Sequence, residues 1–141
     1  MNFSYGIIAI VGVLVAISIG FIAAEPNAVI EPRETPVNSH ILPKTAVVGD
    51  TLIIEVEFRD NDNQIVDHVN YDITAIQNGN SILSDLDAHR HPGMHPIHET
   101  SVLDKSKITI KVTQNGLGHG DDISGSMGNT DIVNLNPEVM E

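Results

Sequence analysis

Cysteine and tryptophan are absent from the 141 residues, and basic residues are few. Without cysteine the chain forms no disulfide and offers no thiolate, so a bound metal must be held by His, Met, Asp, Glu or backbone oxygen atoms. The chain has 7 Lys and Arg residues and 19 Asp and Glu residues, which gives a formal net charge of −12. This charge repels nucleic acid and attracts cations. We therefore expect no nucleic-acid partner.

Sequence motifs of common enzyme classes are also missing. There is no Gly-x-Ser-x-Gly elbow and no cysteine nucleophile. The glycines between 116 and 128 follow a strand pattern without opening a helix, so they do not form a phosphate-binding loop. The sequence therefore favours a binding protein over an enzyme.

Residues 5–24 form an uncharged run rich in Ile, Val, Ala and Gly. At about 1.5 Å rise per residue, a helix of this length crosses a hydrocarbon core about 30 Å thick. No Lys or Arg precedes the run, as a secretory leader would require, so we expect an uncleaved single-pass membrane anchor. Cleavage after Ala24 is the alternative and would give a secreted domain. We expect the domain that follows to be extracytoplasmic, from its acidic, proline-containing flank and by analogy with exported domains.

Small residues recur every four positions along this run, at Gly12, Ala16, Gly20 and Ala24. Such rows allow membrane helices to approach closely. They predict packing against a second copy or another membrane subunit, although glycine and alanine are also common in apolar spans.

The rest of the chain divides by composition. Residues 1–4 are a short N-terminus, 25–40 a proline-containing linker, 41–136 a folded domain and 137–141 a tail. In the domain, apolar residues alternate with polar ones, which is typical of half-buried strands. The expected inward residues are Leu52, Ile54, Val56 and Phe58, then Val69, Tyr71, Ile73 and Ala75, then Ile108, Ile110 and Val112.

Shorter strands are expected at 47–48, 81–83 and 132–135, and Asn78-Gly79 is a strong hairpin signal before the second of these. Six or seven short strands with turns between them and no helical period predict an all-β, immunoglobulin-like antiparallel sandwich. With the apolar N-terminus, the predicted architecture is this sandwich preceded by one transmembrane helix.

The strongest chemical signal is the stretch 87–98, which contains four of the seven histidines. Imidazole is the commonest protein metal ligand, and a mixed imidazole and thioether set favours copper, with zinc as a lesser candidate. Pro92-Gly93 should turn the chain and could bring the later histidines back to the earlier ones. The candidate ligands are His89, His91, His95 and His98, with Met94 and Asp87 as weaker ones. His68 is expected on the surface, and the sequence leaves open whether His40, His68, His119 or Met127 joins the site. The alternative is a solvated loop without a specific ligand.

Three segments, Val48-Gly49-Asp50-Thr51, Tyr71–Ala75 with Gln77-Asn78-Gly79, and His89-Arg90-His91-Pro92-Gly93, together resemble a small β-sandwich domain. This domain recurs in exported and cell-surface proteins of ammonia-oxidising archaea, where a histidine-bearing loop follows the same hairpin. The resemblance implies an extracytoplasmic copper-handling protein, or an accessory subunit of a membrane copper enzyme such as an archaeal ammonia monooxygenase. Asp87-Ala88-His89 is also similar to the Asp-x-His element of CopC-type copper carriers. The competing interpretation is a cell-surface interaction module with incidental histidines.

Overall fold

The computed structural model describes residues 36–119 and 128–140, which belong to one compact unit, Arg33–Glu141. These residues form seven β-strands and no helix, so the all-β class is confirmed for them. None of the described segments contains a helix long and apolar enough to cross a membrane. The expected span at 5–24 and its row of small residues lie outside the described residues, as does Met127.

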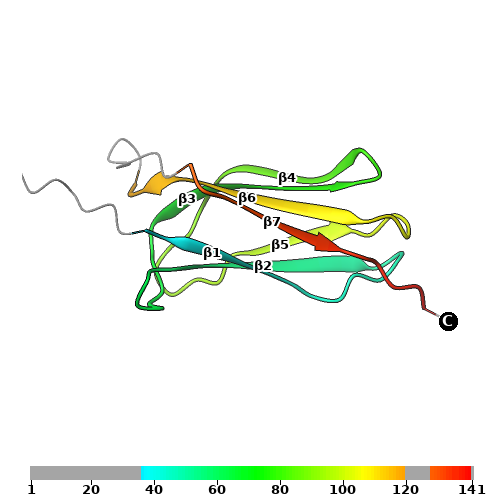
Figure 1. Ribbon diagram of the computed structural model, residues 1–141, viewed down its shortest axis with the longest axis horizontal. Coiled ribbons are helices and arrows are strands. Elements are labelled where there is room, and N and C mark those ends of the chain that lie inside the picture. The colour runs from blue at the N-terminus through cyan, green and yellow to red at the C-terminus, as the bar shows by residue number, and fades with distance from the viewer. Residues whose placement is uncertain (1–35, 120–127, 141) are drawn as a thin grey trace, which may run out of the picture. The chain divides into compact units, whose positions relative to one another are not determined.

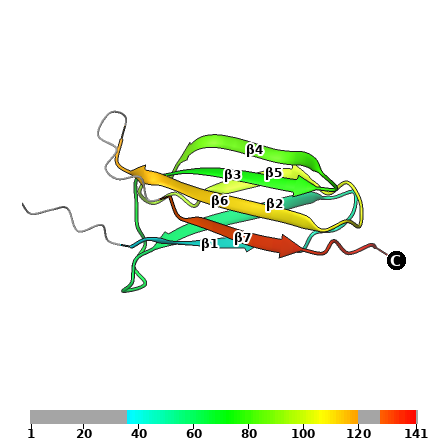
Figure 2. The same ribbon diagram turned by 45° about the horizontal axis from the view of Figure 1, so that its top comes forward.

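The strands are β1 (Asn38–Pro43), β2 (Thr51–Arg59), β3 (Val69–Gln77), β4 (Asn80–His89), β5 (Ile97–Ser101), β6 (Ile108–Leu117) and β7 (Thr130–Leu135). They form two antiparallel sheets with the strand orders β1-β2-β5 and β4-β3-β6-β7. The two sheets are the two layers seen in Figures 1 and 2.

The hydrophobic core lies between the sheets and consists mainly of the inward faces that the alternation predicted. Val37, Ile41, Ala46 and Val102 complete it. Every predicted inward residue of β2, β3 and β6 is at most 1% exposed, which confirms those faces. Phe58 of β2 and Tyr71 of β3 pack together across the layers, with ring centroids 4.9 Å apart. Full burial of a large apolar side chain contributes about 1.5–3 kcal/mol, so this layer of side chains holds the sheets together.

Two strands, β1 and β5, lie where the sequence predicted none. β1 begins inside the expected linker, and Ile41 is its only buried residue. In β5 the buried positions are His98 and Thr100, while Ile97 is exposed. The hydrophobic pattern is therefore weak in β1 and inverted in β5, and alternation of apolar residues could not reveal either strand.

The short strand expected at 47–48 is instead a turn with one parallel bridge, between Val47 and Glu138. Val48 N–H donates to Glu138 O (2.9 Å), and Glu138 N–H donates to Ala46 O (2.7 Å). These bonds tie the segment after β7 to the connection between β1 and β2.

β3 lies between β4 and β6 and is antiparallel to both. The beginning of β3 therefore lies beside the ends of β4 and β6. Asn70, near the start of β3, pairs with His89 at the end of β4 and with Gly116 near the end of β6. Segments far apart in the sequence thus meet at this end of the sheet.

At the end of the sheet where β3 begins, register shifts mark one β-bulge close to Asp87 in β4 and one close to Asn115 in β6. A further shift in the β3–β4 pairing lies near the other end, between Ala75 and Ile76. Asp87 has a φ of 65°, a left-handed conformation that is uncommon outside glycine. Its N–H donates to Asp72 Oδ1 (3.0 Å), and Asn115 Nδ2 donates to the same oxygen (2.9 Å). The Asp72 carboxylate on β3 therefore holds both bulges.

Candidate metal centre

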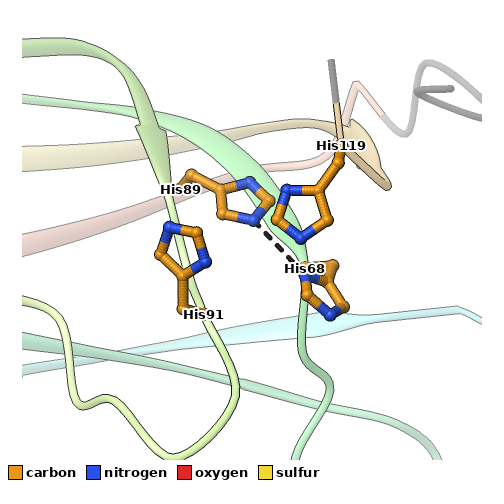
Figure 3. A group of neighbouring side chains, drawn as sticks. All are labelled: His68, His89, His91 and His119. Carbon is orange, nitrogen blue, oxygen red and sulfur yellow. Dashed lines mark hydrogen bonds between the residues drawn. The ribbon is translucent and has the colours of Figure 1, made fainter. Parts of the chain in front are cut away.

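Four histidines meet at the end of the four-stranded sheet where β3 begins. His68 directly precedes β3, His89 is the last residue of β4, His91 follows two positions later, and His119 follows β6. Figure 3 shows the four imidazole rings gathered together. One ligand nitrogen from each ring lies within 4.8 Å of those of the other three. These four residues are called the histidine cluster below.

Backbone hydrogen bonds fix the segments that carry the cluster. His68 N–H donates to Arg90 O (2.8 Å) and Arg90 N–H donates to Val69 O (2.9 Å), which ties the segment after β4 to the start of β3. Gly118 N–H donates to His68 O (2.9 Å), which ties the segment after β6 to the same place. The main chain therefore brings the three segments together.

The His89 ring lies close to the other three rings of the cluster. Its ring centroid is 4.5 Å from those of His91 and His119 and 5.6 Å from that of His68. His68 Nδ1 and His89 Nε2 are 3.4 Å apart. Two nitrogens bound about 2.0–2.1 Å from a tetrahedral zinc ion lie about 3.3 Å apart. This pair therefore already has the spacing of two ligands on one ion.

The cluster has a half-buried side, His68 and His89, and an exposed side, His91 and His119. Burial lowers the pKa of His89, and the positive charge that its three histidine neighbours can carry lowers this pKa further. Metals bind the neutral imidazole. His89 therefore keeps its metal-binding form to a lower pH than a free histidine, while the exposed side is open to solvent ions.

His68 has a φ of 57°, in the left-handed region. For a residue other than glycine such a conformation costs about 1–3 kcal/mol and is concentrated at functional sites. The backbone bonds from Gly118 and to Arg90 hold it in place. This conformation is a second feature, independent of ring proximity, that marks the cluster.

The positive charge of Arg90, between His89 and His91 in the sequence, is neutralised. Its side chain is 4% exposed and pairs with the Asp67 carboxylate. The guanidinium also donates to Val66 O (3.3 Å). The charge is thus compensated locally, although Arg90 lies inside the histidine-rich stretch.

The residues predicted as ligands lie at several places in the structure. Two of them, His89 and His91, belong to the cluster, so the fold brings this predicted pair together. The other predicted ligands lie outside the cluster: His95, His98, Met94 and Asp87.

His95 belongs to a second group, with Glu55 and Glu57 on the outer face of β2. Its Nδ1 lies 3.3 Å from Glu55 Oε1, and its side chain is 63% exposed. Glu57 also accepts a hydrogen bond from Arg59 Nε (2.9 Å). One carboxylate of this group is thus already neutralised by an arginine, which weakens it as a cation site.

His98 is buried on the inner face of β5. Its Nδ1 lies 3.1 Å from Asp85 Oδ2, and its Nε2 lies 2.8 Å from the Tyr71 hydroxyl. A carboxylate only accepts, so Nδ1 carries the hydrogen and Nε2 accepts from the hydroxyl. Burial lowers the pKa of His98, partly opposed by Asp85, and burial together with Asp85 raises the pKa of Tyr71. With both nitrogens engaged, His98 links the two sheets.

Met94 and Asp87 each donate a hydrogen bond through the main-chain N–H. Pro92 and Gly93 turn the chain as predicted: Met94 N–H donates to His91 O (3.2 Å), and Gly93 has a φ of 73°. The Met94 side chain is 58% exposed. Asp87 is the left-handed residue of the β4 bulge, where its N–H is bound to Asp72.

The two other members of the cluster, His68 and His119, come from outside the predicted stretch. His68 was expected on the surface and is instead half-buried against His89. The sequence left open whether His119, in a second loop, contributes a ligand. Position in the sequence was a usable signal for His68, which adjoins the start of a predicted strand. His119 lay in the expected glycine-rich connection, and only the strand order brings it to His68. His40 lies exposed on β1.

The donor set of the cluster is four imidazoles, which suits copper, zinc and nickel. Comparison with protein-family models, with curated proteins and with solved structures found no match for this chain.

Proposed function

We propose that this protein binds a transition-metal ion at the histidine cluster, copper first and zinc second, and that it serves in metal handling. One observation carries the proposal: four imidazole nitrogens from three separate segments lie within 4.8 Å of one another. Three further features support it, namely the left-handed His68, the lowered pKa of His89 and the net charge of −12.

Copper is preferred because sites made of nitrogen ligands bind divalent copper more tightly than zinc or nickel. Zinc is second because four imidazoles also form a closed tetrahedral set. The proposed ligands share His89 and His91 with the set predicted from the sequence, and His68 and His119 take the places of His95 and His98.

The sheet topology supports an immunoglobulin-like sandwich as the scaffold. The first, second and fifth strands share one sheet and the third, sixth and seventh share the other, as strands A, B, E and C, F, G do in immunoglobulin domains. The fourth strand pairs with the third instead of the fifth, which distinguishes this topology from the constant-type arrangement.

The uncharged run at 5–24 supports a single-pass anchor with the domain on the external side, or a secreted domain if the run is a cleaved leader. The row from Gly12 to Ala24 supports a membrane subunit as partner. Together with the resemblance to proteins of ammonia-oxidising archaea, this favours metal delivery or an accessory role beside a membrane copper enzyme such as ammonia monooxygenase.

A second candidate function is a cell-surface interaction module without a specific metal site. Large apolar side chains exposed on and between the strands favour it: Leu86 is 61% exposed, and Ile97 and Leu103 are more than half exposed. Metal stoichiometry separates the two functions.

Calorimetric titration of the full chain in mild detergent with copper and with zinc, checked by elemental analysis, tests the proposal. We expect one equivalent bound with a Kd below about 1 μM. A His68→Ala/His119→Ala variant should lose this binding, and the matched control His40→Ala/His95→Ala should keep it. Loss in the control instead would favour the ligand set of the 87–98 stretch. Weak, non-stoichiometric binding shared by all variants would favour the interaction module.

A further inference from the structure

Asn70 lies on the outer face of β3, between β4, which ends at His89, and β6, which is followed by His119. The flanking Val69 and Tyr71 are buried in the core, so the side chain of Asn70 points away from it. Its cross-strand partners are His89 on β4 and Gly116 on β6. One side chain is thus in reach of both neighbouring strands.

The hydrogen bonds of Asn70 determine which way its amide faces. Its Nδ2 lies 2.9 Å from Gly118 O and 3.4 Å from Gly116 O. Because carbonyl oxygens only accept hydrogen bonds, the NH₂ group must be on this side. The Oδ1 atom then faces His89, and its distance to His89 Nδ1 is 2.7 Å.

This arrangement also fixes the tautomer of His89. An amide oxygen only accepts, so His89 Nδ1 must carry the hydrogen. In the neutral ring the lone pair is then on Nε2, the nitrogen that lies 3.4 Å from His68 Nδ1 inside the cluster. The bond from Asn70 therefore keeps the protonated Nδ1 of His89 outside the cluster and directs Nε2, which carries the lone pair, into it.

We infer that Asn70 is a positioning residue of the metal centre, which holds His89 as the Nδ1–H tautomer so that Nε2 is the ligand atom. The inference rests on the proposed metal-binding function. Outer partners of this kind orient ligating histidines and increase their basicity, and their loss typically weakens metal binding about 10- to 100-fold. Through Gly118, the same amide also ties down the residue before His119.

The first test is imidazole ¹⁵N NMR of the metal-free full chain at about pH 8, where histidine is neutral. We expect His89 Nδ1 to give the protonated signal and Nε2 the unprotonated one in the wild type. In Asn70→Ala the preference should be lost. A wild-type His89 with the hydrogen on Nε2 would overturn the inference.

The second test is titration of the same proteins with copper and with zinc. Asn70→Ala should bind about 10- to 100-fold more weakly than the wild type. Asn70→Asp keeps an acceptor for His89 but loses the donor to the glycine carbonyls, so it should restore the Nδ1–H tautomer and bind more tightly than Asn70→Ala. Wild-type affinity in Asn70→Ala, or equal affinity of the two variants, would overturn the inference.

Asn134→Ala is the matched control, because Asn134 also makes a side-chain bond between strands of this sheet, accepting from Thr109 Oγ1 (2.9 Å). It should match the wild type in both tests. If the wild type itself binds neither metal, the proposed function fails. If the wild type binds and only the Asn70 variants depart from expectation, the positioning role alone fails.

Discussion

Asp85 and His89 lie four positions apart on β4, yet their side chains point to opposite faces of the sheet. Asp85 pairs with the core residue Ile73 and binds the buried His98, whereas His89 pairs with the outward Asn70. Residues an even number apart on a regular strand share a face. The bulge close to Asp87 adds one residue and reverses this parity. Because of this bulge, β4 contributes Asp85 to the contact with His98 of the other sheet and also contributes His89 to the histidine cluster.

The first prediction concerns Asp72, whose Oδ1 accepts hydrogen bonds at both bulges. Asp72→Ala removes two hydrogen bonds, each worth about 0.5–1.5 kcal/mol, and should lower the free energy of unfolding by about 1–3 kcal/mol. It should also weaken metal binding, because one bulge sets the face of β4 on which His89 lies and the other lies just before the segment that carries His119. Urea unfolding and copper titration measure the two effects. Asp72→Asn keeps an acceptor oxygen and should lose less; an unchanged urea midpoint in Asp72→Ala would show that the carboxylate does not hold the bulges.

The second prediction is that metal stabilises the fold, because the cluster joins three segments that separate on unfolding. With free copper at 100 times its Kd, the free energy of unfolding should rise by about 2.7 kcal/mol. Thermal unfolding with and without copper, and after addition of a chelator, measures this gain. The His68→Ala/His119→Ala variant should show no gain. An equal rise of its melting temperature would place the bound metal elsewhere.

The third prediction is a loss of stability in mild acid. The pKa values of His89 and His98 are lowered in the folded protein, both mainly by burial. The unfolded chain therefore takes up these protons first, so the free energy of unfolding should fall as the pH drops through 6.5. Urea unfolding of the metal-free chain as a function of pH checks this.

A His98→Gln variant tests the same pH dependence, because glutamine can bond both Asp85 and Tyr71 but does not titrate. Its stability should vary less with pH than that of the wild type. His40→Gln, on the exposed side of β1, should keep the wild-type pH dependence. Identical pH profiles for His98→Gln and the wild type would mean that protonation of His98 does not affect stability.

The fourth prediction concerns the membrane. If residues 5–24 span a bilayer, the full chain should stay in the membrane fraction after washes with high salt and alkaline carbonate and be released only by detergent. A Gly12→Asp/Gly20→Asp variant should be released more easily, because charges in the middle of a span are costly. Release of the wild-type chain by salt alone would refute an integral anchor.

The sequence predicted the faces of the long strands because each places apolar residues on every second position. The structure buries the expected inward residues of β2 and β6: Leu52, Ile54, Val56, Phe58, Ile108, Ile110 and Val112. β5 escaped prediction because its inward residues are His98 and Thr100, both polar. β5 is held by its antiparallel pairing with β2 and by the bonds of His98 to the other sheet, and no local pattern reports either.

The metal centre was predictable only in part, for a similar reason. Histidine density identified His89 and His91, but grouping them with His68 and His119 requires the order β4-β3-β6. This order depends on pairings between residues 19 and 46 positions apart, such as those of Asn70 with His89 and Gly116. The bulge at Asp87 also reverses the face of His89 relative to simple alternation.

The most direct measurement is X-ray absorption spectroscopy of the full chain loaded with zinc and, separately, with copper. We predict imidazole nitrogens as the only protein ligands, four of them in the zinc form at about 2.0–2.1 Å. The spectrum of four imidazole ligands should be absent from the His68→Ala/His119→Ala variant, which loses the site. A sulfur ligand from Met94, or a spectrum that this variant leaves unchanged, would contradict a metal centre formed by His68, His89, His91 and His119.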